Sequence, residues 1–436
     1  MQVSVEVTSD LSRNMKVIVP EEKIQQQVDN RLKSMSQKVK IDGFRPGKVP
    51  ASVIRKQYGQ QVRHEVIGDL IQSSFQEGVR GENLHPAGSP EIREARFDEG
   101  EGLEYVAHFE ILPEFVIMPL ETLEVTEFQS SVEDADVDRM IEQLVDQKKK
   151  WETADRESQK GDQVTISFEG THDGENFTQG RTEDFPVEIG SGQMIPGFED
   201  QLVGHRAGDR FEFDITFPEN YQGPKLAGKT AHFEIELIRV AEPVRPAVDE
   251  IFVRSFGVES GSLDEFRADI RSNMEREMKR AIRARTKTSV MDQLFERNPI
   301  QLPEVLLREE LAELIKPYQE SARKRKQTLN ETEIKEQLSP LARRRVSLGL
   351  VLGKVMEAHE VKHQPERVRA AIDELASSYE DPEEVVRWYY ADPARTQEII
   401  NMTMEDQIVD LVLGKAKKTL ESIEFQKLMQ AAGNPV

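Results

Sequence analysis

The stretch Gly43-Phe44-Arg45-Pro46-Gly47-Lys48-Val49-Pro50 separates two long helical patterns. It holds two glycines and two prolines in eight residues, and such a segment interrupts regular structure. Apolar residues recur at helical spacing before it, over residues 24–39, and after it, over residues 53–75. The sequence therefore predicts a helix–loop–helix hairpin whose tip carries Phe44 and Arg45. An aromatic and a cation at such a tip indicate a binding loop.

The predicted hairpin is basic, although the chain as a whole has a formal net charge of -22. Residues 31–63 contain nine basic residues and one acid, Asp42, which gives the segment a charge of +8. A basic tip on an acidic chain indicates an anionic partner. Contacts of this kind with phosphates would be sensitive to salt and independent of base sequence. The alternative is a solvated hairpin whose charges bind nothing.

The pattern Gly-Phe-Arg-x-Gly-x-x-Pro in a basic hairpin resembles the docking signature of the trigger factor family of bacterial ribosome-associated chaperones. The resemblance extends over the full chain. It implies docking on the large ribosomal subunit, on protein and rRNA at the exit of the nascent-chain tunnel. The family often has lysine where this chain has a proline, which here removes one charge and stiffens the loop. The implied ribosome-binding residues are Gly43, Phe44, Arg45, Pro46, Gly47 and Lys48.

Composition limits the classes of protein to which the chain can belong. Its 436 residues suit two to four domains, and 32% charged against 6% aromatic residues favours long, partly solvated helices. Cysteine is absent, which excludes a disulfide framework and thiol chemistry. No apolar run approaches the ~18 residues of a membrane span, and the N-terminus lacks the apolar centre of a signal peptide. We therefore expect a cytoplasmic protein that makes no use of membranes.

The expected fold class is multidomain α+β. Residues 1–112 place alternating, strand-like runs around the helical hairpin and predict an α+β docking domain. Residues 113–150 predict an extended linker with one helix. Residues 151–243 combine short strands with Gly and Pro turns and predict a compact β-rich domain. Residues 244–436 carry helical periodicity and predict an all-α C-terminal domain.

The C-terminal helical runs have more apolar positions than a thin stripe would need. Two interpretations remain open: a bundle whose apolar faces are all internal, or an arm with apolar residues facing a cavity. Residues 342–354 and 376–382 resemble the C-terminal region of the trigger factor family. The resemblance implies two arm-like projections that form an open cradle for nascent and unfolded polypeptides, with no nucleotide cycle. It also suggests a homodimer for molecules that are off the ribosome.

Two short motifs match enzyme signatures but lack the context that those enzymes need. Residues 223–230 fit the phosphate-loop pattern GxxxxGK[ST], yet the next residues alternate as a strand, and Pro224 removes an amide donor. His359 and His363 fit HExxH, but Pro365 ends that helix and no third ligand is suitably spaced. We therefore expect neither an ATP site nor a metal site, and no cofactor.

Aromatic residues are concentrated in the β-rich segment, where nine fall within 66 positions. Three blocks there, at 161–170, 190–200 and 217–221, resemble the FKBP-type peptidyl-prolyl isomerases in order and spacing. The resemblance implies a bent antiparallel sheet wrapped on a short helix, with a proline pocket between them. The nine aromatic residues are Phe168, Phe177, Phe185, Phe198, Phe211, Phe213, Phe217, Tyr221 and Phe233.

The FKBP resemblance also assigns residues to this pocket. Phe198 forms the floor, where many relatives have tryptophan, and Tyr221 offers a hydroxyl near the entry. Thr178 stands where relatives often have aspartate, which concerns the family's macrocyclic inhibitors more than catalysis. For any single phenylalanine, ordinary core packing is the alternative. The walls are formed by Phe168, Phe177, Phe185, Met194, Ile195 and Phe233.

The expected isomerisation of X–Pro bonds needs neither a nucleophile nor an acid–base pair. The barrier to rotation, ~18–20 kcal/mol, arises from the double-bond character of the C–N bond. An apolar pocket withdraws water from the charge-separated planar amide, and aromatic walls that bind the twisted bond more tightly lower the barrier further. Two other functions stay open: a free prolyl isomerase whose flanking domains only localise it, and a nucleic-acid-binding protein that uses the basic hairpin.

Overall fold

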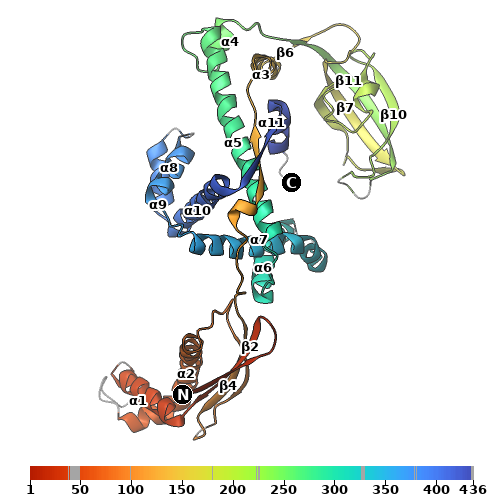
Figure 1. The fold of residues 1–436 in the computed structure, drawn as a ribbon. Helices are drawn as coiled ribbons and strands as arrows, with labels where there is room; N and C mark the ends of the chain where they lie inside the picture. The colour runs from red at the N-terminus through yellow and green to blue at the C-terminus, as the bar shows by residue number, and fades with distance from the viewer. Residues whose placement is uncertain are drawn as a thin grey trace. The chain divides into compact units, whose positions relative to one another are not determined.

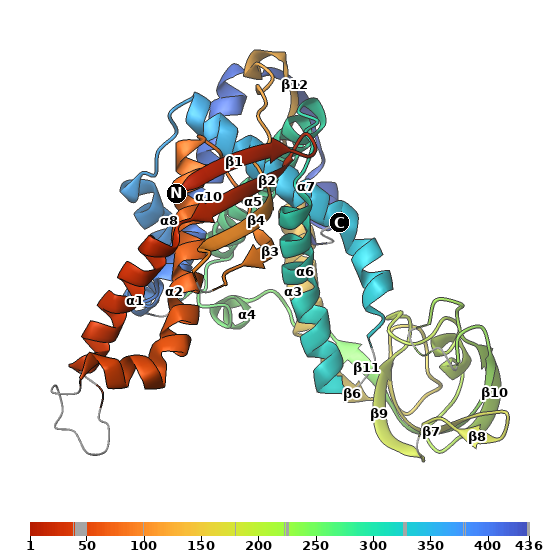
Figure 2. The ribbon, with the colours of Figure 1, turned by 90° about the horizontal axis from the view of Figure 1, so that it is seen from below.

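The computed structural model describes residues 1–37, 39, 50–98, 100–178, 180–221, 223, 226–325, 329–377, 379 and 381–433. The chain divides into two compact units. The first unit combines Met1–Phe128 with Ala284–Glu421, and the second combines Gln129–Arg283 with Ser422–Val436. Figures 1 and 2 show the helices and strands of both units in two views.

The N-terminal part of the first unit is a four-stranded antiparallel sheet with two helices packed against it. Met15, Val17 and Val19 alternate into the core, as the strand prediction requires. Both predicted helices are present, although the apolar pattern before the loop ran on to Val39, which lies beyond the end of the first helix. In sheet order the strands are β1 (Gln2–Val7), β2 (Ser12–Val19), β4 (Leu103–Glu110) and β3 (Glu91–Arg96), and the helices are α1 (Glu21–Ser36) and α2 (Ala51–Gly81).

The remainder of the first unit is a helical core that the extended connector completes. Leu120, Leu123 and Val125 of the connector are buried among apolar side chains of several helices. The connector strand β5 (Glu124–Gln129) pairs with β12 (Lys417–Ser422), so the helical C-terminal region has a strand added that the sequence pattern did not predict. The helices are α5 (Leu263–Arg297), of which the second half lies in this unit, α6 (Glu304–Arg325), α7 (Glu331–Ala358), α8 (Pro365–Ala376), α9 (Pro382–Tyr390) and α10 (Pro393–Lys415).

The helical part of the second unit is built around the predicted connector helix, α3 (Asp134–Gln147). A capping box starts this helix: the Glu133 N–H donates to Oδ2 of Asp136 at 2.9 Å, and the Glu133 side chain caps in return. Val137, Ile141 and Val145 then point to a core shared with the neighbouring helices. Those neighbours are α4 (Glu250–Arg254), the first half of α5, and α11 (Phe425–Gly433).

The β-rich domain of the second unit is an antiparallel sheet organised on its longest strand. That strand, β11, pairs with three others, and its register with β7 shifts between Leu237 and Arg239. Such irregularities bend a strand, in keeping with the expected bent sheet. A short 3-10 helix, η2 (Glu199–Leu202), packs on this sheet through Phe198 and Leu202. The strands are β6 (Lys150–Thr153), β7 (Gln163–His172), β8 (Glu175–Asn176), β9 (Thr182–Glu188), β10 (Arg210–Thr216) and β11 (Thr230–Val244).

Among the described residues, no helix has both the length and the apolar character that are needed to cross a bilayer.

Candidate active site

Phe198 lies at the centre of an aromatic cluster between η2 and the sheet. Its side chain has no exposed surface. Its ring centroid lies 5.2 Å from that of Phe233, 5.3 Å from that of Phe213 and 6.2 Å from that of Phe168. All three pairs are edge-to-face, the arrangement that the ring quadrupoles favour. Phe213 is one of the nine aromatic residues of this segment but not one of the eight predicted pocket residues.

The eight predicted pocket residues range from fully buried to well exposed. Phe185 is 38% exposed and lies edge-on to Phe168, with 5.7 Å between the ring centroids. Tyr221 is 39% exposed and packs on Phe217 at 4.6 Å. A dry floor with a partly exposed rim suits a site that accepts one apolar group. The two buried members are Phe198 and Phe233, and Phe168, Phe177, Met194 and Ile195 are half-buried.

Gly170 on β7 makes room for the ring of Phe177. A Cβ atom on Gly170 would lie 2.9 Å from both Cε atoms of that ring and closer still to its Cζ. The Phe177 N–H donates to the Gly170 carbonyl at 3.1 Å, and its ring contacts Phe217 and Phe233. No role for Gly170 follows from the sequence predictions. A glycine inside a strand is the signal that could have found it, because it often marks a close approach.

Thr178 secures the same turn by hydrogen bonds. Its Oγ1 accepts from the Gly170 N–H at 3.2 Å and lies 2.9 Å from Oδ1 of Asn176 and 2.8 Å from the Gly180 carbonyl. The single hydroxyl proton serves one of these two acceptors at a time. Thr178 therefore holds the backbone that carries Phe177.

The helix η2 begins with a buried acid, Glu199, that gathers the preceding loop. Its Oε2 accepts from the N–H groups of Gly190, at 2.7 Å, and Gly192, at 3.0 Å. Its Oε1 accepts from the Met194 N–H, at 3.1 Å, and the Ser191 hydroxyl, at 3.0 Å. Burial raises the pKa of Glu199, but these four hydrogen bonds outweigh burial, so its pKa lies below the ordinary range. The side chain is therefore an anion at neutral pH.

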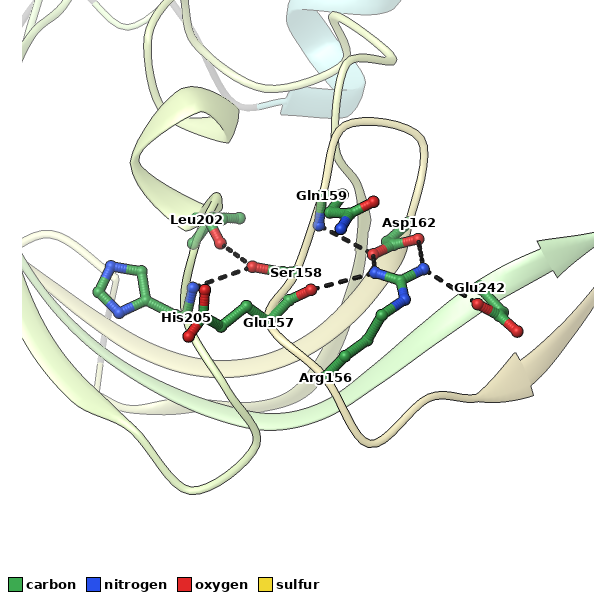
Figure 3. Close-up of polar contacts among 8 residues, drawn as sticks. All are labelled: Arg156, Glu157, Ser158, Gln159, Asp162, Leu202, His205 and Glu242. Atoms are coloured by element: carbon green, nitrogen blue, oxygen red, sulfur yellow. Dashed lines mark hydrogen bonds and ion pairs between the residues drawn. The ribbon is translucent and has the colours of Figure 1, made fainter.

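Ser158 anchors the end of η2, as Figure 3 shows. Its hydroxyl donates to the Leu202 carbonyl at 2.5 Å and accepts from the His205 N–H at 3.2 Å. The Ser158 backbone adds an N–H bond to the His205 carbonyl at 2.8 Å. A buried serine with these partners fixes the helix that follows Phe198.

An ion-pair network holds the segment that contains Ser158. The Arg156 guanidinium binds the buried Asp162 carboxylate through two hydrogen bonds, of 2.6 and 2.9 Å, and reaches Glu242 of β11 at 3.0 Å (Figure 3). Asp162 also accepts from the Gln159 N–H at 2.8 Å. These two acids raise the pKa of Arg156 above its usual range. The network ties the start of the β-rich domain to its last strand.

Each part of this architecture matches a known protein family. Three family models match in order: bacterial trigger factor protein over residues 1–144, FKBP-type peptidyl-prolyl cis-trans isomerase over 154–238, and the trigger factor C-terminus over 262–414. The chain is 44% identical over 429 residues to trigger factor of Thioalkalivibrio sulfidiphilus, which covers 98% of both chains. It is 43% identical to that of Stutzerimonas stutzeri, over 100% of this chain and 99% of the relative.

The chain belongs to the trigger factor family. A solved structure of a trigger factor chaperone shares the fold, with a TM-score of 0.51 and 18% identity over 95% of this chain and 100% of the other. The protein is thus a chaperone of this family and an FKBP-type peptidyl-prolyl isomerase, as the sequence predicted.

The docking residues that the trigger factor signature implies, Gly43–Lys48, lie outside the described residues. Their described flanks correct one part of the charge argument. Arg63, one of the nine basic residues counted for the hairpin, is buried and pairs with Glu21 through two hydrogen bonds of 2.6 and 2.9 Å. Arg55 forms an exposed pair with Asp29. The count of +8 therefore overstates the positive charge that the hairpin can offer to a partner.

Neither the phosphate-loop pattern nor the HExxH pattern has the structural context that its enzyme class needs. β11 begins at Thr230, so a strand follows residues 223–230, and no long helix starts there. The helix α7 ends at Ala358, which leaves His359 and His363 beyond it. Within the described part of the chain, no cluster of three or more acidic or histidine side chains is arranged to hold a metal ion.

Proposed function

We propose that this chain is an ATP-independent chaperone that docks at the ribosomal tunnel exit, holds nascent chains and isomerises their X–Pro bonds. The observation that carries the proposal is the order of three matched modules on one chain: an N-terminal trigger factor part, an FKBP-type isomerase and a trigger factor C-terminus. We assign docking to residues 1–112, isomerisation to 151–243 and client holding to 244–436, with 113–150 as linker. The proposed location is the cytoplasm, with a homodimer off the ribosome.

Isomerisation is assigned to the aromatic cluster. The prolyl ring enters past the exposed Phe185 and Tyr221 and lies among the other predicted wall residues, above the fully buried floor residue Phe198 that supports them. The phenylalanine edges and apolar side chains offer no hydrogen-bond donor to the amide oxygen, so the charge-separated planar form of the bond loses hydration. The Tyr221 hydroxyl donates a hydrogen bond to a substrate carbonyl and so fixes its pose. Rings that contact the twisted bond more closely than the planar bond supply differential binding.

Client holding is assigned to apolar side chains that the helices of the first unit leave exposed. The helix α9 has no buried residue at all, and Trp388 and Tyr390 on it are 52% and 47% exposed. Large exposed apolar groups mark interaction surfaces. They favour the second of the two interpretations of the helical region, in which some apolar residues remain available to a client. Further exposed members are Tyr318, Leu341, Leu375 and Tyr379.

Docking is assigned to the loop between α1 and α2, with protein and rRNA of the large subunit as partners. Replacing Phe44, Arg45 and Pro46 together with alanine is expected to abolish co-sedimentation with large ribosomal subunits. The same variant should retain wild-type prolyl isomerase activity, which is the control for folding. Retained co-sedimentation would refute the docking assignment. Equal binding of the wild-type protein to free RNA would favour the nucleic-acid-binding alternative.

A further inference from the structure

We propose that Glu199 is a positioning residue for prolyl isomerisation: its carboxylate holds residues 190–194 so that Met194 and Ile195 face the substrate. The proposal rests on the proposed pocket, because it concerns how one wall of that pocket is kept in place. Glu199 acts through the loop and not on the substrate. Both of its oxygens are occupied by donors of the loop, at 2.7 to 3.1 Å.

The loop is shaped to enclose this carboxylate. Four donors from five consecutive residues converge on two oxygen atoms. Gly190 and Gly192 have φ values of +93° and +70°, a backbone region that glycine enters at no steric cost. These conformations turn successive N–H groups inward and make an anion-binding concavity. The anion that occupies it is a side chain of the same domain, only 8% exposed.

The same contacts join the wall of the pocket to its floor. Glu199 directly follows Phe198, and the Phe198 N–H donates to the Ile195 carbonyl at 3.0 Å. Gly197, with φ of +88°, allows the chain to turn between the two. Loop and floor are therefore fixed to one another at two points, the backbone bond and the carboxylate. Loss of the carboxylate leaves Met194 and Ile195 free to move away from Phe198.

The test compares Glu199→Gln with a matched control in the full-length protein. Glutamine keeps the size of the side chain but replaces one oxygen with an NH₂ donor, so one of the two pairs of loop donors loses its acceptor. We expect kcat/KM for a prolyl tetrapeptide to fall roughly 10- to 100-fold, as misplacement of a contact group by about 1 Å can cause. The control is Asp200→Asn, which removes an exposed carboxylate from the next position of η2 and should leave kcat/KM unchanged.

Two further measurements separate positioning from a merely structural role. The amide proton shifts of Gly190, Gly192 and Met194 should titrate together with the Glu199 carboxyl in the wild-type protein, and this shared titration should vanish in Glu199→Gln. Near-UV circular dichroism and Tm report whether the domain stays folded. A lower Tm with unchanged kcat/KM well below that Tm would overturn the proposal, and so would an equal loss of activity in Asp200→Asn.

If Glu199→Gln does not fold, Ser191→Ala carries the test, because it removes one donor from an exposed position of the loop. A roughly two- to threefold fall in kcat/KM is expected, and wild-type kcat/KM would overturn the inference. Failure of the proposed pocket is distinguishable from failure of this inference. If Phe198→Leu keeps full activity, the pocket is wrong. If Phe198→Leu loses activity while Glu199→Gln keeps it, only the positioning role is wrong.

Discussion

At Gly170, strand β7 passes directly beneath the ring of Phe177, so even a methyl group there must displace that ring. Gly170→Ala is therefore expected to lower prolyl isomerase activity roughly tenfold by misplacing one wall of the pocket. A peptide isomerisation assay measures the effect, and near-UV circular dichroism reports the ring environment. Gly349→Ala on α7, where an added Cβ meets no atom within 4 Å, is the control that should leave activity intact. Full activity in Gly170→Ala would remove Phe177 from the pocket.

Phe198, the proposed floor of the pocket, is also part of the core of the domain. Because its side chain is completely buried, Phe198→Ala should cost about 3–5 kcal/mol of stability, and lost activity would then have two causes. Phe198→Leu separates them, since it keeps most of the volume and should cost less than about 1.5 kcal/mol. We expect activity to fall at least tenfold in this variant, because a leucine supports the rings of Phe168 and Phe233 less precisely and so misplaces the walls that they form. Isomerisation rates and urea unfolding, measured on the same preparation, check both statements.

At the scale of elements, several ion pairs join α1 and α2, and two of them differ strongly in burial. The Arg63 and Glu21 side chains are 8% and 18% exposed, whereas those of Arg55 and Asp29 are 58% and 54% exposed. Arg63→Met leaves Glu21 without its charged partner at the largely buried contact between α1 and α2. This change should lower the local free energy of unfolding by about 3 kcal/mol. Arg55→Met should cost less than about 1 kcal/mol. Hydrogen exchange of the amides in α1 and α2 measures both, and equal effects would contradict the difference in burial.

From the Arg63–Glu21 pair we also predict how the contact between α1 and α2 responds to low pH. The hydrogen bond from Arg63 is the largest of the effects that hold the pKa of Glu21 below its ordinary value of 4.5. A lowered folded-state pKa contributes stability above the unfolded pKa, and this stability is lost as the pH falls through the folded value. Protection of α1 amides should therefore decline below pH 4.5, and the decline should be smaller in Glu21→Gln. An equal decline in both proteins would assign it to other groups.

Elements that bury a regular apolar face were predictable from the sequence, and two elements without a buried residue, α9 and β12, were not. In the strand Ser12–Val19 and the helix Asp134–Gln147, the spacing of apolar residues in the sequence matches the residues that are buried. The helix α9 begins at Pro382 and only partly buries Val386 and Tyr389, and every residue of β12 is exposed. β12 is a strand because it pairs with β5, which lies almost 300 residues earlier. A local sequence pattern cannot reveal such a distant partner.

The candidate site divides in the same way. Its aromatic residues were predictable because rings of this number in one domain are conspicuous and fall in recognisable blocks. Glu199 and Gly170 were not, because an acid and a glycine are ordinary surface and turn residues until their neighbours are known. The burial of Arg63 was hidden for the same reason, since a charge count does not tell which cations have partners.

At the scale of the whole molecule, the geometry of the β-rich domain allows a clean deletion. Lys150 and Val244, which flank the segment 151–243, are paired side by side on β6 and β11. Joining them by a short linker should leave the remainder folded. We expect the deletion variant to lose prolyl isomerase activity and to keep suppression of aggregation of an unfolded client. If suppression disappears too, while full-length Phe198→Leu retains it, the isomerase domain itself holds clients and the free-isomerase alternative gains support.

The core around Leu120, Leu123 and Val125 has a consequence for how the protein is made. These residues leave the ribosome early, but their partners Val351, Ile408 and Val412 come from α7 and α10, and β12 follows later still. A growing chain can complete the sheet of residues 1–110 long before then, yet the connector must wait until the residues up to Ser422 have been made. During its own translation, each molecule therefore exposes the apolar residues of an incomplete hydrophobic core. Under the proposed function, the protein's own growing chain is therefore one of the nascent chains that need to be held.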